Sequence, residues 1–344
     1  MTAAGDIDGD GQPELILGQD PNAARTTRDE VSVYRMSQTL PPELIASASA
    51  FDRRGTSGSG NFLIGDVIPS EPGDEIVVAE DGAGRRASHL RVLGGLGRGE
   101  LRVIHKLRAL NSRSAARAPL LFALGNVVPG AGHPGLEIVV GDPTGYVHVF
   151  GVTAEGGKRL RRFRAFPDSL GTAVTALGAG DFLPGTAGDE IAVAGAGAHY
   201  DGLVRILSGL TGTILLEFQA FAPQAVPTGV QLWAADLLAD LPGSELVVGQ
   251  GEGGGQLRVF SLAGGVPKAV LDIPGNELRQ TSLARHLASG DLDPTLPGNE
   301  IAVAQADASL PVEVFHLTQN GAERCASIDT SDVIDTIGAI AVGR

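Results

Sequence analysis

One stretch of this sequence recurs six times, and that repeat restricts the possible folds more than any other feature. In its first copy, a carboxylate-rich loop begins at Gly5 and leads directly into a short apolar segment, 14–18. A polar residue near the start of each loop recurs at steps of 60, 60, 55, 55 and 55 residues, at Asp6, Asp66, Asn126, Asp181, Asp236 and Asp291. A fixed period of this size indicates an array of one supersecondary unit. We therefore treat 1–344 as a single domain with repeats of about 1–61, 62–120, 121–173, 174–229, 230–283 and 284–336.

The fourth repeat shows the unit most clearly. It contains four apolar segments, 174–179, 190–194, 203–207 and 214–221, separated by turns rich in glycine and proline. These segments have the length and residue types of strands and lack helical spacing. Second strands such as 76–79 are continuously apolar, as central buried strands are, whereas third strands such as 90–93 alternate. The repeat predicts an all-β fold, a β-propeller of six four-stranded antiparallel blades.

The two ends of the chain leave the closure of the ring open. Residues 337–344 read as the start of a seventh repeat or as a ring-closing strand. Such a strand would compete with residues 1–4 for the inner position of one blade. Six blades are the favoured interpretation, and part of a seven-bladed ring is the alternative.

The motif Gly-Asp-x-Asp-Gly-Asp-Gly, followed by Glu-Leu-Ile-Leu-Gly, resembles the FG-GAP repeat of the integrin α-subunit propeller and its bacterial relatives. The segment 62–66, Phe-Leu-Ile-Gly-Asp, matches the leading part of that repeat. The resemblance covers the whole chain and is strongest in repeats one and six. It implies a propeller whose loops between first and second strands can hold calcium. It also implies a role in extracellular adhesion or binding.

The first loop has the residue types of a calcium site. Asp6, Asp8 and Asp10 stand at alternate positions, followed by Gln12 and Glu14. Calcium prefers oxygen ligands from carboxylates and carbonyls, and the intervening glycines allow a loop to wrap around the ion. We predict that the four carboxylates and the backbone carbonyl of Gln12 bind Ca²⁺. The alternative is an Asx-rich turn without an ion.

Repeat six offers a weaker second site. Its candidate ligands are Asp291, Asp293, Thr295 and Glu300, and the loop lacks a third aspartate. In repeats two to five the equivalent third position is apolar, at Ile68, Val128, Leu183 and Leu238. We predict that these loops are metal-free and that an apolar plug replaces the ion. The glutamate before each second strand, at Glu75, Glu137, Glu190 and Glu245, is expected to accept backbone N–H bonds rather than to act in catalysis.

Composition limits the partners. The chain of 344 residues has a formal net charge of −14, and nucleic-acid binding normally needs a basic face, so no nucleic-acid partner is expected. The acidity fits either solubility alone or partial neutralisation by bound cations. The single cysteine, Cys325, excludes an internal disulfide and a zinc site built from cysteines. No apolar run has transmembrane length, so no membrane insertion is expected.

One basic run departs from the acidic background. Lys158, Arg159, Arg161, Arg162 and Arg164 lie in the predicted fourth strand of repeat three. Such a run could bind a polyanion. Charge on an outer edge strand also prevents edge-to-edge pairing, and the sequence alone favours this second explanation.

A partner site is expected on the face opposite the calcium loops, because loops on a rigid scaffold often carry binding residues. The candidates are Arg53, Arg54, Arg85, Arg86, Arg113, Arg117, His199 and Tyr200. Arginines there could bind an acidic group on a protein or glycan, or could be ordinary solvated loop charge.

These features favour a noncatalytic, calcium-binding adhesion or binding module, monomeric or part of a larger chain. The location expected is extracellular, periplasmic or at the cell surface, which requires a leader outside this sequence. The alternative is a carbohydrate-active enzyme, such as a polysaccharide lyase, on a propeller scaffold. No nucleophile elbow, phosphate loop or paired-histidine motif supports catalysis.

Overall fold

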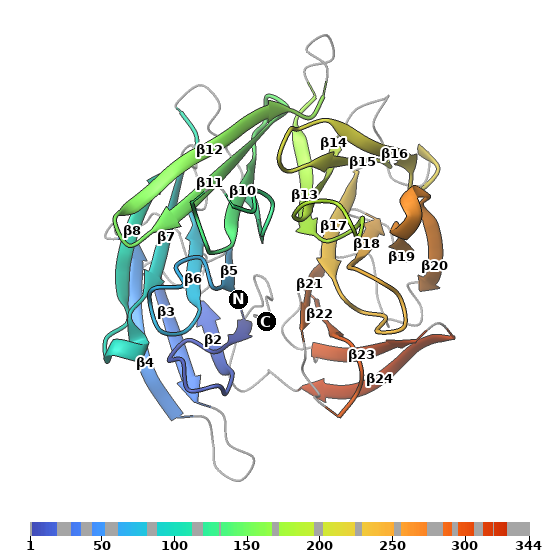
Figure 1. Ribbon diagram of the computed structural model, residues 1–344. Coiled ribbons are helices and arrows are strands. Elements are labelled where there is room, and N and C mark those ends of the chain that lie inside the picture. Colours follow the sequence, from blue (N-terminus) through green and yellow to red (C-terminus); the bar gives the residue numbers. More distant parts are fainter. Residues whose placement is uncertain are drawn as a thin grey trace.

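The computed structural model describes residues 2–18, 29–35, 43–51, 61–80, 88–111, 120–130, 132–166, 172–195, 202–223, 229–250, 256–273, 285–290, 295–305, 312–318 and 320–328. These residues form six four-stranded antiparallel sheets, and within each sheet the strands pair in chain order. The sheets are arranged around a central axis as the blades of a six-bladed β-propeller (Figure 1). The predicted fold class is therefore confirmed.

The blades follow one another along the chain. Blade 1 contains β1 (Thr2–Gly5), β2 (Glu14–Gly18), β3 (Asp29–Arg35) and β4 (Glu43–Phe51). Blade 2 contains β5 (Phe62–Gly65), β6 (Glu75–Ala79), β7 (His89–Gly94) and β8 (Arg102–Arg108), with the 3₁₀ turn η1 (Leu96–Arg98). Blade 3 contains β9 (Leu121–Gly125), β10 (Glu137–Gly141), β11 (Tyr146–Thr153) and β12 (Gly156–Arg164). Blade 4 contains β13 (Val174–Gly180), β14 (Glu190–Gly195), β15 (Leu203–Ser208) and β16 (Ile214–Gln219). Blade 5 contains β17 (Val230–Ala235), β18 (Glu245–Gln250), β19 (Leu257–Ser261), η4 (Ala263–Gly265) and β20 (Lys268–Ile273). Blade 6 contains β21 (Arg285–Gly290), β22 (Glu300–Gln305), β23 (Val312–Thr318) and β24 (Gly321–Ile328).

The position of each strand in its blade explains its composition. The second strands β6, β10 and β14 are buried along their whole length, because a neighbouring blade covers each of their faces. The outer strands β8, β12 and β16 are largely exposed. In every blade the pairing of the third and fourth strands shifts register, twice in blade 1 and once in each of the others, and such bulges increase the twist of the outer strand.

Hydrophobic clusters fill the spaces between successive blades. One cluster joins blades 1 and 2 and includes Ile16 and Phe62, and equivalent clusters join blades 2 and 3, 3 and 4, 4 and 5, and 5 and 6. Small residues allow close approach near the axis: Gly125 lies against Ala179, and Gly180 lies against Ala234. Within the described residues, no such cluster spans blades 6 and 1.

A backbone hydrogen bond also crosses each of these five junctions. The acceptor in each bond is the backbone carbonyl of the polar residue near the start of the first loop of a repeat. The donor is the N–H of the residue just before the glutamate that begins the second strand of the next blade. The pairs are Asp74 to Asp6 (2.7 Å), Leu136 to Asp66 (2.9 Å), Asp189 to Asn126 (2.8 Å), Ser244 to Asp181 (2.7 Å) and Asn299 to Asp236 (2.9 Å). The equivalent residue in blade 1 is Pro13, which has no N–H to donate. The junction between blades 6 and 1 therefore cannot contain this bond, because the proline nitrogen carries no hydrogen.

Arginines on third strands form a further contact between blades. Arg205 on β15 donates to the carbonyl oxygen of Ala165 (2.7 Å) and stacks 5.2 Å from the ring centre of Phe166, both at the end of blade 3. Arg258 on β19 contacts Ala220 and Phe221 of blade 4 in the same way, at 2.7 and 4.8 Å. In blade 2 the equivalent Arg91 stacks on Phe51, at the end of blade 1.

The N-terminal strand holds the inner position of blade 1, because β1 pairs with β2 from Thr2 to Gly5. The predicted ring-closing segment, 337–344, lies outside the described residues. Among the described residues, no helix is long and apolar enough to cross a membrane.

Candidate metal site in the first loop

The first loop connects β1 to β2 and is shaped by its glycines and by its own carboxylates. Gly9 and Gly11 have φ values of 76° and 86°, which side chains other than glycine rarely adopt. The Oδ2 atom of Asp6 accepts the N–H of Gly11 (3.0 Å), and Asp10 accepts the N–H of Gln12 (2.8 Å). These short-range bonds are Asx-type turns, so the loop curls around its own acidic side chains.

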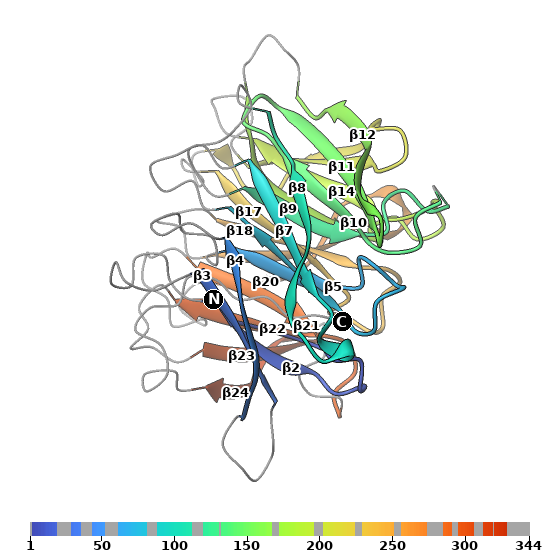
Figure 2. The ribbon, with the colours of Figure 1, turned by 90° about the vertical axis from the view of Figure 1, so that its left-hand side faces the viewer.

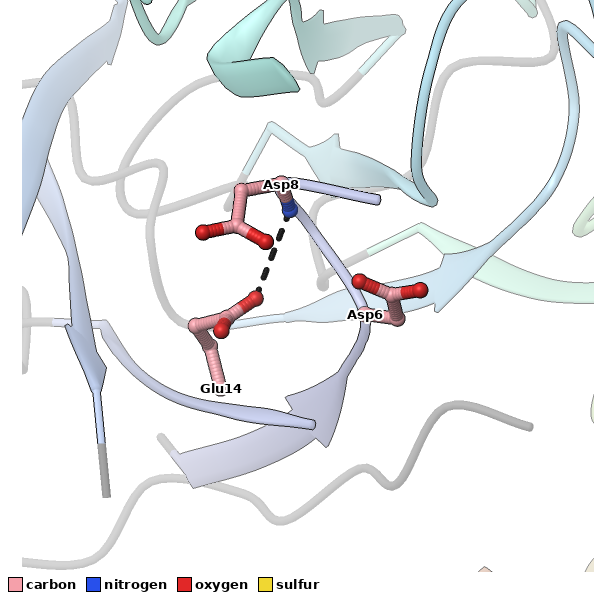
Figure 3. Close-up of side chains that lie close together, drawn as sticks. All are labelled: Asp6, Asp8 and Glu14. Atoms are coloured by element: carbon pink, nitrogen blue, oxygen red, sulfur yellow. Dashed lines mark hydrogen bonds between the residues drawn. The ribbon is translucent and has the colours of Figure 1, made fainter. Parts of the chain in front are cut away.

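Three of the five predicted ligands lie close together. One carboxylate oxygen each from Asp6, Asp8 and Glu14 lies within 4.8 Å of the other two, as Figure 3 shows. The Oδ1 atom of Asp6 is buried without a hydrogen-bond partner. Asp10 and Gln12 are exposed at the rim of the loop and do not belong to this cluster. The sequence placed all five residues in one loop but did not predict that only three would converge.

Glu14 differs from the two aspartates because it is buried and already holds the loop. Its Oε2 atom accepts the N–H groups of Ile7 (2.9 Å) and Asp8 (3.3 Å). Burial is the largest effect on its carboxyl group and raises its pKa, and the nearby Asp8 and Asp10 raise it further. Glu14 thus holds the turn through two N–H bonds and also contributes one carboxylate oxygen to the cluster.

An arginine balances part of this negative charge. Nη2 of Arg35, at the end of β3, lies 2.5 Å from Oδ2 of Asp8 and 3.9 Å from Oδ2 of Asp10. Sequence reasoning missed Arg35, because it lies 27 positions from Asp8 and only the β2–β3 pairing brings it back to the loop. Its guanidinium group thus contacts two of the predicted ligand carboxylates.

The donor set nevertheless fits a hard cation. All candidate ligand atoms are oxygens, two of the three clustered residues are aspartates, and one buried aspartate oxygen has no partner. Calcium takes such oxygens in flexible geometry and accepts water for the remaining positions. Asp74 of the next blade donates its N–H to the Asp6 carbonyl, and burial raises its pKa to about 6, but its carboxylate is not part of this cluster.

The glutamates of the other blades confirm the predicted turn role. Glu75 accepts the N–H groups of Val67 (3.0 Å) and Ile68 (2.8 Å), and Glu245 accepts those of Leu237 (2.9 Å) and Leu238 (3.0 Å). Glu137 accepts the loop N–H of Val128, and Glu190 accepts the loop N–H of Leu183. All are nearly inaccessible to solvent. Burial raises the pKa of Glu75 to about 8 and that of Glu245 to about 7.

The apolar plug is also present in these loops. Ile68, Val128 and Leu238 are buried, whereas Leu183 is half-buried. In the first loop the equivalent residue is Asp8, so a carboxylate replaces the apolar side chain that the loops of blades 2 to 5 have at this position.

The other predicted sites are only partly described. In repeat six, Thr295 is exposed, and Glu300 is buried with Oε1 3.3 Å from Nδ1 of His316. Asp291 and Asp293 lie outside the described residues. The predicted ligand-binding residues Arg53, Arg54, Arg85, Arg86, Arg113, Arg117, His199 and Tyr200 also lie outside them, so they remain predictions.

The comparisons with known proteins support the fold. No protein-family model matches the sequence, and no curated protein sequence matches it. The chain is similar in structure to BBS1N in its complex with ARL6DN, with a TM-score of 0.54 and 12% identity over 95% of this chain and 82% of that chain. It is also similar to Sqt1 of Saccharomyces cerevisiae, with a TM-score of 0.51 and 10% identity over 97% of this chain and 76% of that chain. A chain of the mitotic checkpoint complex gives a TM-score of 0.51 and 11% identity over 95% of this chain and 87% of that chain. At these identities the likeness establishes a β-propeller and does not confirm the FG-GAP resemblance.

Proposed function

We propose that this propeller is a noncatalytic protein-binding module whose first loop takes up calcium as a structural ion. The observation that carries the proposal is the convergence of Asp6, Asp8 and Glu14 in one loop, with the Asp6 Oδ1 atom buried and unpaired. An unpaired buried carboxylate oxygen is costly, and a divalent cation would remove that cost. The equivalent loops of blades 2 to 5 carry an apolar residue at the position of Asp8, so calcium is proposed for the first loop.

Calcium would act on the fold rather than on a reaction. The first loop touches blade 2, because Gly9 lies against the backbone of Gly73 and Asp74 donates to the Asp6 carbonyl. An ion held by Asp6 and Asp8 would fix this loop and, through it, the junction of blades 1 and 2. Arg35 is the competing cation, since it contacts the Asp8 carboxylate. The ion-free loop is therefore partly neutralised, and calcium would compete with the guanidinium group for Asp8.

The binding role and the location rest on the class of fold and on the resemblance of the repeat. β-Propellers present loops and edges on a rigid scaffold, and two of the structurally similar chains are described in complexes with proteins, one with ARL6DN and one in the mitotic checkpoint complex. The FG-GAP resemblance supports an extracellular, periplasmic or cell-surface location. Extracellular calcium modules bind with dissociation constants of about 10⁻⁴–10⁻³ M, which a loop with a competing arginine could reach.

Calorimetric titration and thermal unfolding with calcium or with a chelator test the metal. We expect Asp8→Asn to lower calcium affinity at least tenfold and Arg35→Gln to raise it, since the first removes a ligand charge and the second removes the competitor. Asp240→Asn is the matched control, because Asp240 is exposed in the equivalent loop of blade 5. At a calcium concentration about 100 times the dissociation constant, the folded protein should gain about 2.7 kcal/mol. If neither the wild type nor Arg35→Gln binds calcium or changes its melting temperature, the metal role is wrong.

A further inference from the structure

The outer strand of blade 3 is the most basic strand in the described part of the chain. Strand β12 carries Lys158, Arg159, Arg161, Arg162 and Arg164, and all but Arg164 are exposed. It lies at the rim of the propeller, away from the central axis (Figures 1 and 2). Its outer edge is not paired with any described strand, because the sheet ends at β12. This face is therefore a basic, unpaired edge on a chain whose net charge is −14.

Protection against edge-to-edge pairing does not explain this concentration of charge. The same protection would be needed on every outer strand, because each blade ends in an unpaired edge. The outer strands β4, β16, β20 and β24 each carry at most one lysine or arginine. Only β8, the neighbour that β12 contacts, is comparably basic among the described outer strands. The charge is thus local to blades 2 and 3.

Three of the four arginines of β12 are held in place by neighbouring groups. Arg162 and Arg164 lie over the ring of Tyr146, at 3.6 and 4.7 Å from its centre, and Arg164 donates to the Tyr146 hydroxyl (2.9 Å). On the other face, Nε of Arg161 donates to the carbonyl oxygen of Leu210 in blade 4 (3.2 Å). Within the described residues, neither Arg159 nor Arg162 forms an ion pair with a carboxylate. Fixed guanidinium groups lose less conformational entropy when they bind an anion.

Exposed apolar side chains border the basic strand. Ile214 and Leu215, at the start of β16, are 49% and 39% exposed and are among the few large apolar residues that face solvent. They follow Gly212, which lies so close to the Phe163 ring of β12 that a Cβ atom would overlap it. The start of β16 is thereby placed beside β12. A partner at this edge would meet the cations of β12 and, on the side of Arg161 that faces blade 4, the apolar pair.

We infer that the edge of β12 binds an extended, acidic protein segment that also carries apolar side chains. Alternate side chains of an extended segment point to the same side at intervals of about 6.6 Å, which matches the spacing of Arg162 and Arg164 along the regular part of β12. Carboxylates suit the fork of the guanidinium group, and the free strand edge offers backbone hydrogen bonds. A nucleic acid fits less well, because its continuous negative charge would also face the acidic remainder of the molecule. This inference rests on the proposed protein-binding role and specifies its partner.

Fluorescence anisotropy with two labelled peptides tests the inference. One peptide alternates glutamate with leucine, and the other alternates lysine with leucine. We expect the wild-type protein to bind the glutamate peptide, with an affinity that falls as salt rises. Combined Arg159→Glu and Arg162→Glu should weaken this binding at least tenfold. Combined Lys268→Glu and Arg324→Glu is the control, since it changes the net charge equally on outer strands β20 and β24 and should change the affinity less than threefold.

Several outcomes would overturn the inference. Equal loss of binding in both charge-reversal variants would show a general charge effect, and tighter binding to duplex DNA or to anionic vesicles would assign the surface to another partner.

Melting temperatures establish that each variant is folded, and Arg159→Gln with Arg162→Gln replaces the glutamate variant if that one does not fold. A panel of immobilised proteins separates the two proposals. Binding to the panel that is unaffected by the β12 variants refutes the inference alone, whereas no binding to any protein or peptide refutes the protein-binding role as well.

Discussion

Replacing Glu245 by glutamine tests whether the buried glutamate of each blade holds its turn in the protonated, uncharged form. Glu245 is fully buried, and its Oε2 atom accepts two loop N–H groups while its Oε1 atom has no partner. Burial raises its pKa from 4.5 to about 7. A glutamine oxygen can accept the same two bonds without carrying a charge. The substitution therefore separates the effect of the charge from the effect of the hydrogen bonds.

The direction of the pH effect follows from the raised pKa. Between pH 4.5 and about 7 the folded protein keeps the proton on Glu245, whereas the unfolded chain has lost it. The stability contributed by this group is fully present below pH 4.5 and is lost as the pH rises through about 7. At about 1.4 kcal/mol for each unit of pKa, the loss approaches about 3 kcal/mol as an upper limit. Glu245→Gln should avoid this loss, because glutamine does not titrate.

The measurement is the free energy of unfolding in urea at several pH values from 4.5 to 8, in calcium-free buffer. We expect Glu245→Gln to match the wild type within about 1 kcal/mol near pH 4.5 and to become more stable than the wild type as the pH rises. Glu75→Gln should show a larger gain, because the pKa of Glu75 is raised to about 8. Glu100→Gln, an exposed change of the same charge, is the control. A stability difference that does not change with pH for Glu245→Gln would refute the reasoning.

Two further predictions concern the junctions between blades. Arg205→Met should reduce the free energy of unfolding by about 2–3 kcal/mol, because it leaves the Ala165 carbonyl oxygen without its charged donor. Arg258→Met should cost less, since the Arg258 side chain is 32% exposed against 10% for Arg205, and equal costs in urea unfolding would contradict the role of burial. The amide hydrogens of Leu136 and Ser244 should exchange slowly with solvent although both lie in loops, because each donates across a blade junction. The exposed turn residue Gly130 is the reference for fast exchange, and equally fast exchange at Ser244 would show that its bond to Asp181 is not stable.

Much of the fold was determined by local sequence pattern. The period of 55–60 residues requires a repeat, and the alternating or continuous apolar segments identify the strands of each blade. The role of the buried glutamates was also predictable, because a carboxylate just before a central strand lies within reach of the preceding turn. Glu75, for example, accepts N–H groups only seven and eight positions away. Such contacts depend on one hairpin, and the hairpin is specified by its own residues.

Contacts between residues far apart along the chain could not be predicted from the sequence. Arg35 meets Asp8 across 27 positions, and Arg205 meets Ala165 across 40 positions. The first contact depends on how β3 pairs with β2, and the second depends on the angle between neighbouring sheets. The same limit applied to the first loop, where five candidate ligands were evident but the convergence of Asp6, Asp8 and Glu14 was not.

The basic strand β12 of blade 3 shows the difference between what the sequence reveals and what only the structure reveals. Its five basic residues are evident in the sequence, and the sequence alone explains them as charge that prevents edge-to-edge pairing of an outer strand. Only the assembled propeller shows that most other outer edges lack such charge, that Tyr146 holds two of the arginines, and that Ile214 and Leu215 lie next to them. The sequence by itself determined the blades and their turns, because these depend on neighbours within one repeat. The tertiary structure alone decided which surfaces face each other, because ring packing brings together residues that lie far apart along the chain.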